Sequence, residues 1–236
     1  MTDDTESPSL SAARRIAHIA PLTTLSEKVR ASHTALIVID MQNDFCASDG
    51  FVAKGGRDVS LVQQIAKRLP ALIEHARGAG VLVVFVRCAY STNENLYLSD
   101  VWLEQAARRQ GGGYTLAPVC QDGTSGGEYY GSIRPTAGDI VVTKHRYSAF
   151  HGTDLDMILR SHGVRTVVLT GVSTHVCVET AAREAFVRDY YTVVVGNGSA
   201  AYSQQEHETA LKLVDRFFGE VTSIDDIRLL WPLRNL

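Results

Sequence analysis

The sequence predicts an α/β fold in which helices cover both faces of a parallel β-sheet. Two observations lead to this prediction. Short segments such as residues 35–39 and 81–86 are apolar throughout, and amphipathic helical segments lie between them. Strands of a parallel sheet are buried on both faces, so they read as continuous apolar runs and not as alternating ones. The 236 residues, 45% of them hydrophobic, suffice for one large domain.

The domain is expected to span residues 33–236, after an N-terminal arm at residues 1–32. The arm is polar and weakly amphipathic over residues 11–20. It either lies on the domain or a neighbouring subunit, or forms a partly disordered tail. Its acidic start, Asp3 and Asp4, is followed by no apolar core, which argues against a secretory signal peptide.

Five apolar segments in chain order are the expected strands, at residues 35–39, 81–86, 140–142, 166–169 and 191–195, and residues 220–223 are a candidate for a short sixth strand. Apolar residues at helical spacing predict a helix over residues 61–76, in which Pro70 either introduces a bend or begins a second half. Further helices are expected after two capping boxes, Thr153 with Asp156 and Ser203 with Glu206. Residues 89–138 are rich in glycine and weakly periodic, which predicts a long excursion that shapes the mouth of a pocket.

Charge and cysteine content exclude several function classes. The net charge is -3, from 23 Lys and Arg against 26 Asp and Glu, which favours neither nucleic acid nor a membrane as partner. The 4 cysteines are widely spaced without a C-x-x-C pair, which disfavours a thiolate zinc site or a disulfide scaffold. Free thiols in a large domain are typical of a cytoplasmic protein.

Three polar residues follow the expected strands, at the edge where ligands bind in parallel sheets. They are Asp40, Lys144 and Cys177. Each also has an ordinary interpretation: an aspartate is often a turn residue, a lysine a solvated charge, and a cysteine a small core hydrophobe. As a set, they predict acyl transfer. The Cys177 thiolate attacks a carbonyl, Asp40 takes and returns its proton, and Lys144 keeps Asp40 ionised.

Three segments resemble the signature motifs of isochorismatase-like cysteine hydrolases. They read IVIDMQNDF at residues 37–45, GDIVVTK at 138–144 and TGVSTHVCV at 170–178, and the resemblance covers roughly residues 33–222. It implies a three-layer α/β/α fold with a six-stranded parallel sheet, and a triad of Asp40, Lys144 and Cys177. It further implies a cis peptide between Val172 and Ser173, with an oxyanion hole formed by the Ser173 and Cys177 amides.

Sequence differences from individual members of the family narrow the range of reactions expected for this chain. Nicotinamidases hold a metal on histidines just after the first motif, but residues 46–60 contain no histidine. No metal and no cofactor is therefore expected. True isochorismatases lack the nucleophilic cysteine, which favours amide chemistry here. The segment from Lys144 to Phe150 resembles that of ureidoacrylate amidohydrolases, whereas biuret hydrolases have a second lysine where Tyr147 stands.

The predicted function is hydrolysis of a C–N bond in a small ureido, carbamoyl or primary amide compound through a thioester, releasing ammonia or carbamate. Phe45 and Tyr147 are the expected substrate-binding residues, although Phe45 is equally well explained as core packing. The resemblance implies a homodimer or homotetramer. Two alternatives stay open: a metal-assisted nicotinamidase-type amidase, which chelation would inactivate, and a catalytically idle binding or sensor protein that uses the same thiol.

Overall fold

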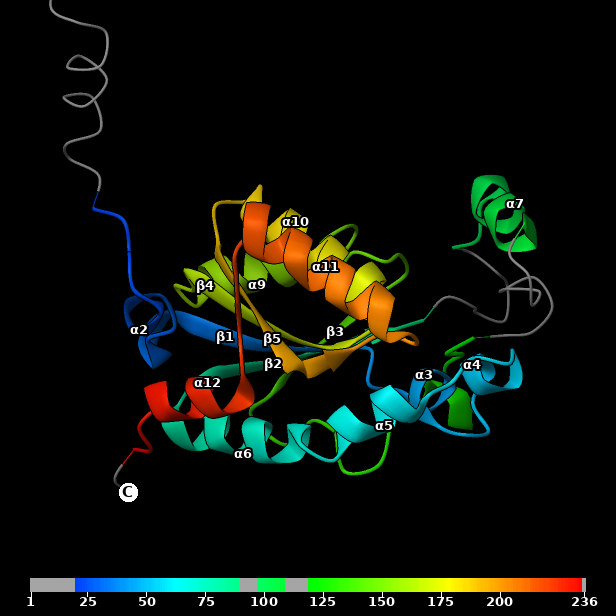
Figure 1. The fold of residues 1–236 in the computed structure, drawn as a ribbon, viewed down its shortest axis with the longest axis horizontal. Coiled ribbons are helices and arrows are strands. Elements are labelled where there is room, and N and C mark those ends of the chain that lie inside the picture. Colours follow the sequence, from blue (N-terminus) through cyan, green and yellow to red (C-terminus); the bar gives the residue numbers. More distant parts are fainter. Residues whose placement is uncertain (1–19, 90–96, 109–118, 235–236) are drawn as a thin grey trace, which may run out of the picture.

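The core of the molecule is a six-stranded sheet in which all neighbouring strands run parallel, in the order β3-β2-β1-β4-β5-β6. The computed structural model describes residues 20–89, 97–108 and 119–234. Figure 1 shows the sheet as a central layer between two layers of helices, which confirms the predicted three-layer fold. The strands are β1 (Thr34–Ile39), β2 (Leu82–Cys88), β3 (Ile140–Lys144), β4 (Thr166–Val172), β5 (Tyr191–Ala200) and β6 (Glu220–Thr222).

Different helices cover the two faces and the two ends of the sheet. One face is covered by α5 (Ser60–Ala66), α6 (Leu69–Ala79) and α12 (Ile224–Leu230), and the other by α9 (Leu155–Ser161), α10 (Glu179–Phe186) and α11 (Gln204–Phe217). The shorter helices α3 (Asn43–Cys46) and α4 (Phe51–Lys54), together with α7 (Asp100–Arg108), lie beyond the carboxyl ends of the strands. At the amino ends lies α2 (Leu25–Lys28).

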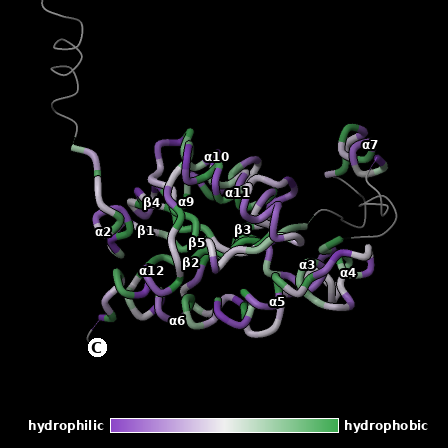
Figure 2. Tube along the Cα trace, viewed as in Figure 1, coloured by the Kyte–Doolittle hydropathy of each residue, from purple (hydrophilic) through white to green (hydrophobic). Residues whose placement is uncertain are grey.

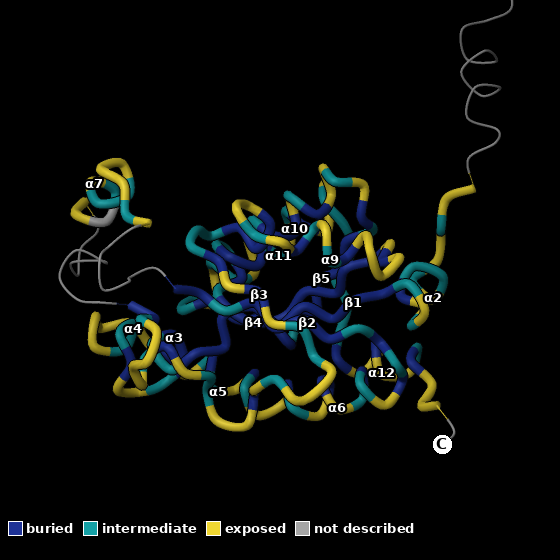
Figure 3. Tube along the Cα trace, turned by 180° about the vertical axis from the view of Figure 1, so that it is seen from behind, coloured by how far each residue is buried: buried dark blue, intermediate teal, exposed yellow. Residues whose placement is uncertain are grey.

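Burial on both faces explains why the central strands β1 and β4 are rich in apolar residues. In β1, Leu36 and Val38 belong to the cluster beneath α5 and α6, whereas Ile37 and Ile39 belong to the cluster beneath α10. Figures 2 and 3 show the strands as the apolar, buried centre of the molecule, with exposed residues on the outer helical faces. Each fully buried Leu, Ile or Val side chain contributes about 1.5–3 kcal/mol relative to exposure.

Local signals for helix ends were largely correct. Pro70 lies in the first turn of α6, so it begins a second helix, since a first-turn residue has no intrahelical N–H bond to lose. Gly80 ends α6 at φ 74°, and the Ser203 side chain accepts a hydrogen bond from the Glu206 N–H, which caps α11. The capping box at Thr153 was wrong. Its hydroxyl donates to the Ala149 carbonyl at 2.6 Å instead.

Four strands, β2, β3, β4 and β5, end later than their sequences predicted, and the ends of β3 and β5 matter for the site. Lys144 is the last residue of β3, paired in register with Cys88 of β2. The fifth strand continues to Ala200 because an irregularity absorbs three extra residues: Leu169 of β4 pairs with Val194, but Gly171 pairs with Ser199.

The described part of the N-terminal arm lies against the domain. Leu22 N–H donates to the Tyr191 hydroxyl at 2.8 Å, and the Trp231 indole donates to the Val29 carbonyl at 2.6 Å. Residues 1–19 lie outside the described residues, so the arm's contact with a neighbouring subunit stays a prediction. Within the described ranges, no helix is long and apolar enough to cross a membrane.

Candidate active site

The three predicted residues Asp40, Lys144 and Cys177 meet at the carboxyl edge of the sheet. Lys144 Nζ lies 2.8 Å from Asp40 Oδ2 and donates to Cys177 Sγ at 3.4 Å. Lys144 also donates to the Arg146 carbonyl at 3.0 Å. All three side chains are buried, with at most 6% of Cys177 exposed. The cluster is therefore an ion pair in contact with a thiol, in surroundings that strengthen electrostatic interactions.

Asp40 owes its place to an unusual backbone conformation. It follows β1 with φ 54°, a left-handed conformation that Asp and Asn adopt more readily than other residues with side chains. Its N–H donates to the Val86 carbonyl of β2 at 2.8 Å. Gly171 of β4 lies beside this turn at φ 106°, and a Cβ there would lie 2.1 Å from the Ile39 carbonyl oxygen. A glycine is thus required for the two strand ends to approach so closely.

Cys177 lies in a five-residue π-helical turn, Thr174–Val178, that leads into α10. The Ser173 carbonyl accepts hydrogen bonds from the Val176 and Val178 N–H groups at 3.1 and 3.2 Å, which hold the turn closed. The peptide bond between Val172 and Ser173 is cis, as the family resemblance implied. Short π-helical segments occur frequently at functional sites.

Burial and charge shift the pKa values of the three groups. Burial raises the pKa of the Asp40 carboxyl, against the opposing effect of the Lys144 charge and of hydrogen bonds from Lys144 and Cys177. Burial alone would lower the pKa of Lys144, but the charges of Asp40 and Cys177 outweigh it and raise that pKa. Burial also raises the pKa of the Cys177 thiol, although the Lys144 charge opposes this. Burial thus raises the pKa of both the Asp40 carboxyl and the Cys177 thiol, and the Lys144 ammonium opposes the rise in each.

The two predicted substrate-binding residues lie on different elements. Phe45 is on α3, is 8% exposed and packs into the cluster beneath α5 and α6, as the core-packing interpretation allowed. Tyr147 is partly buried, and its ring centroid lies 4.8 Å from that of Trp102 on α7. The structure therefore brings Asp40, Lys144 and Cys177 together, whereas Phe45 packs into the core cluster and Tyr147 packs against Trp102.

Comparison with known proteins assigns the family. Residues 34–226 match the family model described as the Isochorismatase domain. The chain belongs to the isochorismatase family. It is 35% identical to the ureidoacrylate amidohydrolase RutB of Variovorax paradoxus (strain S110) over 212 residues, which are 84% of this chain and 81% of the relative. It is 33% identical to RutB of Stutzerimonas stutzeri (strain A1501), over 84% and 82% of the two chains.

Solved structures of the isochorismatase family share this fold. A cysteine hydrolase from Pseudomonas syringae pv. phaseolicola 1448A aligns with a TM-score of 0.73 and 25% identity, over 90% of this chain and 97% of the other. N-carbamoylsarcosine amidase from Thermoplasma acidophilum aligns with a TM-score of 0.63 and 31% identity, over 82% and 97%. Together with the RutB relatives, these findings confirm the predicted enzyme class, an amidohydrolase.

Tyr202 is a residue of the site that the sequence interpretation missed. It comes two residues after β5, and its hydroxyl donates to the Phe45 carbonyl at 3.3 Å. Burial raises the pKa of Tyr202, and so do the charges of Cys46, Cys177 and Asp40. The signal was present, because Tyr202 follows a strand. It was missed because the expected strand ended at Val195, whereas β5 continues to Ala200.

Polar side chains that follow Asp40 hold the neighbouring loop in place. The Gln42 amide donates to the Cys88 carbonyl at 3.0 Å and accepts from the Cys88 N–H at 2.7 Å. It also donates to the Gly127 carbonyl at 2.8 Å. Asp44 Oδ2 accepts from the Cys120 N–H at 2.7 Å. These bonds attach residues 120–127 of the excursion to the end of β2, next to the triad.

The histidines near the motifs have separate partners. His145 Nδ1 lies 2.7 Å from the Ala89 carbonyl oxygen, His175 Nε2 lies 3.6 Å from Glu206 Oε2, and His151 is exposed. Within residues 20–89, 97–108 and 119–234, no three His, Cys, Asp or Glu side chains are grouped so that they could hold a metal ion. Cys46, Cys88 and Cys120 are buried free thiols, in agreement with a structural role.

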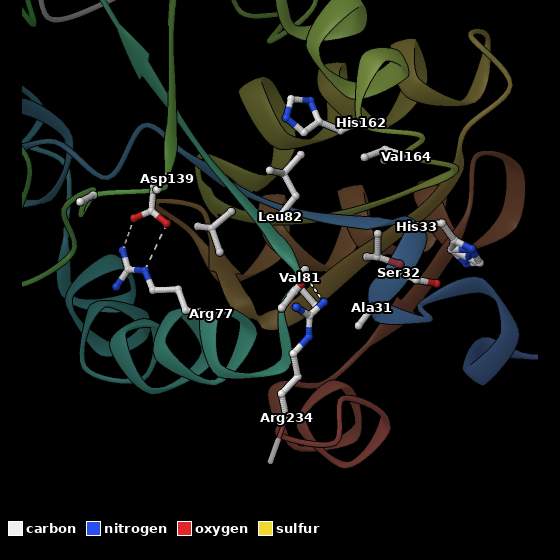
Figure 4. A pocket seen from close by; sticks show the side chains of 15 residues that line it. Ala31, Ser32, His33, Arg77, Val81, Leu82, Asp139, His162, Val164 and Arg234 are labelled. Carbon is white, nitrogen blue, oxygen red and sulfur yellow. Dashed lines mark hydrogen bonds and ion pairs between the residues drawn. The ribbon is translucent and has the colours of Figure 1, made fainter. Parts of the chain in front are cut away.

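A cavity of about 590 Å³ lies at the opposite, amino edge of the sheet (Figure 4). It is lined by His33, Arg77, Leu82, Asp139, His162 and Arg234, among others. Arg77 forms an ion pair with Asp139, and Arg234 donates to the Gly80 carbonyl at 3.3 Å. The charged groups of this cavity are thus engaged with nearby partners, and the cavity is separate from the triad.

Proposed function

We propose that this chain hydrolyses a C–N bond of a small ureido, carbamoyl or primary amide compound, with Cys177 as the nucleophile. The contact of Cys177, Lys144 and Asp40 supports this proposal most directly. A compound of the ureidoacrylate class is the first substrate to test, since the RutB relatives are ureidoacrylate amidohydrolases. The similarity to N-carbamoylsarcosine amidase supports a carbamoyl compound as the next.

The first half-reaction forms a thioester. As Cys177 Sγ attacks the substrate carbonyl carbon, its proton passes to the Asp40 carboxylate, whose raised pKa makes it a stronger base. In this mechanism, the oxyanion that develops on the carbonyl accepts hydrogen bonds from the Ser173 and Cys177 amides. When the tetrahedral intermediate collapses, the C–N bond breaks and Asp40 returns the proton to the leaving nitrogen.

The second half-reaction consumes water. Asp40 takes a proton from water as its oxygen attacks the thioester carbonyl, and the C–S bond breaks to regenerate the Cys177 thiol. Through both steps the Lys144 ammonium faces the carboxylate and the sulfur, so it stabilises whichever of them carries the negative charge. No metal ion is needed for this sequence of steps.

The test is ammonia release from a panel of ureidoacrylate, N-carbamoyl amino acids, biuret, maleamate and nicotinamide. We expect turnover of one ureido or carbamoyl compound, and a loss of at least about 10³-fold in Cys177→Ser, because the alcohol is a far weaker nucleophile beside this base. Cys46→Ala, which removes another fully buried thiol on α3, is the matched control and should retain activity.

Two results would contradict the proposal. Near-normal turnover by Cys177→Ser would exclude the thioester mechanism. Turnover of nicotinamide alone, lost on chelation and restored by zinc or iron, would favour a metal-assisted amidase. Nicotinamidase from Bacillus subtilis is a structural neighbour at 26% identity and a TM-score of 0.66 over 81% of this chain and 99% of that one. Because of this similarity, the test includes the measurement of activity after chelation.

A further inference from the structure

The backbone just after Lys144 takes part in orienting its ammonium group. Lys144 Nζ has three N–H donors, and it lies against Asp40 Oδ2 at 2.8 Å, the Arg146 carbonyl at 3.0 Å and Cys177 Sγ at 3.4 Å. Two of these partners are catalytic groups. The third is the main-chain carbonyl of Arg146, so its position depends on the contacts that fix the segment from His145 to Tyr147.

That segment is bound on one side to α7, which lies beyond the carboxyl ends of the strands (Figure 1). The Arg146 guanidinium carbon lies 5.2 Å from the ring centroid of Trp102, within the range of a cation–π interaction. The Tyr147 ring lies 4.8 Å from the same indole, at an interplanar angle of 50°. Trp102 therefore touches both residues that flank the carbonyl's peptide unit.

On its other side the segment is bound to the end of β2. His145 Nδ1 lies 2.7 Å from the Ala89 carbonyl oxygen, and the Tyr97 ring stacks on the imidazole with 3.6 Å between centroids. Arg146 Nη1 additionally donates to the His145 carbonyl at 2.7 Å. The segment is thus fixed at both sides, and Trp102 supplies the contacts that come from α7.

We propose that Trp102 is a positioning residue for this active site, which holds the Arg146 carbonyl where it orients the Lys144 ammonium toward Asp40 and Cys177. The reaction that Trp102 would assist rests on the proposed function. The effect of Trp102 on the ionisation of the Cys177 thiol does not depend on that function. Without the indole, the segment gains freedom, the carbonyl moves from the ammonium, and the ammonium stabilises the Cys177 thiolate less well.

The test measures alkylation of Cys177 by iodoacetamide as a function of pH, with the Cys177 peptide quantified by mass spectrometry in the full-length chain. The ionisable groups that act on this thiol are Lys144, Asp40, Cys88 and Tyr202. We expect the midpoint of the profile to rise by about 0.5–1 pH unit in Trp102→Ala, because a displaced cation stabilises the thiolate less. Greater access alone would change the maximal rate and leave the midpoint unchanged.

Two variants serve as controls. Trp102→Phe keeps an aromatic face for Arg146 and should shift the midpoint by less than half as much. Val101→Ala alters the neighbouring residue of α7, which is 72% exposed, and should leave the profile unchanged. An unshifted midpoint in a folded Trp102→Ala protein would overturn the proposal. If that variant does not fold, Arg146→Ala removes the other partner of the contact but keeps the carbonyl, and an unshifted midpoint there has the same meaning.

Alkylation requires no substrate, so the result stands even if the amide panel gives no turnover and the proposed function fails. Where the panel identifies a substrate, Trp102→Ala should lower kcat by about tenfold and change KM less than about twofold, as for lost orientation of a catalytic group. A change confined to KM would assign Trp102 to substrate binding and overturn the positioning role.

Discussion

The two ends of the sheet each hold an aspartate against a basic side chain, yet the two carboxyl groups differ in pKa. At the carboxyl end, Asp40 faces Lys144, and burial raises its pKa. At the amino end, Asp139 pairs with Arg77, and its pKa is lowered although burial opposes this. The two sites differ in burial, since Asp40 is buried whereas Asp139 as a residue is half-buried, although both side chains are little exposed, at 1% and 5%.

The supply of hydrogen bonds differs between the two carboxyl groups as well. Asp139 accepts from the Thr136 N–H at 2.7 Å, from the Thr136 hydroxyl at 3.1 Å and from two nitrogens of Arg77. These donors stabilise its charged form. Asp40 has the Lys144 ammonium and the Cys177 thiol, and the thiol is a weak donor. The many donors around Asp139 favour its charged form, whereas the few donors around Asp40 suit the proton-accepting role proposed for it.

Among the substitutions that test this difference between the two aspartates, Lys144→Met should have the largest effect on stability and turnover, because it leaves Asp40 without its cation. The buried carboxylate must then take up a proton or remain uncompensated, at a cost of about 3–5 kcal/mol in the free energy of unfolding. A protonated Asp40 cannot act as a base, so turnover should fall by at least about 100-fold. Denaturant unfolding and ammonia release measure the two effects.

A double variant, Asp40→Asn with Lys144→Met, is the matched control. It replaces the ion pair by neutral groups, and asparagine tolerates the left-handed backbone at this position. Stability should recover in part while turnover stays absent. If Lys144→Met alone unfolds at the wild-type denaturant concentration, the buried ion pair is not the main influence on Asp40.

A smaller effect, on stability only, is expected from Asp139→Asn. It removes a charge-assisted pair and should cost about 1–3 kcal/mol without lowering turnover. Because the pKa of Asp139 in the folded chain is lowered, its contribution is present above its unfolded pKa and is lost as pH falls through the folded value. Unfolding measured from pH 7 to pH 3 should therefore show a flatter acid limb in the variant. An equally steep limb would mean that other carboxylates dominate.

The smallest effect is expected from Glu74→Gln, on the same arginine. Glu74 also pairs with Arg77, from three residues away on α6, but its side chain is 71% exposed. Solvent weakens such a pair, so the change should be below about 0.5 kcal/mol. A loss as large as that of Asp139→Asn would show that Arg77, and not the burial of its partner, determines the energetics at this edge.

The sequence predicted the features that depend on local pattern. Continuous apolar runs located the strands, and the rule that ligands bind beyond strand ends identified Asp40, Lys144 and Cys177. Tyr202 was missed because an irregularity in β5 lengthens that strand past two glycines, which needs the pairing with β4 to be seen. The Trp102 contact was missed because it joins segments about 45 residues apart in the chain, which no periodicity reports.

The strand order also determines which side chain can complete the triad. Asp40 follows β1 and Lys144 ends β3, with β2 between them, and neighbouring strands are about 4.8 Å apart. The cation must reach over the end of β2, where Cys88 is the register partner of Lys144. Only a long, flexible side chain covers that distance, and only a small residue beneath leaves it room. Interchanging Lys144 and Cys88 would keep the composition of the site and lose its geometry.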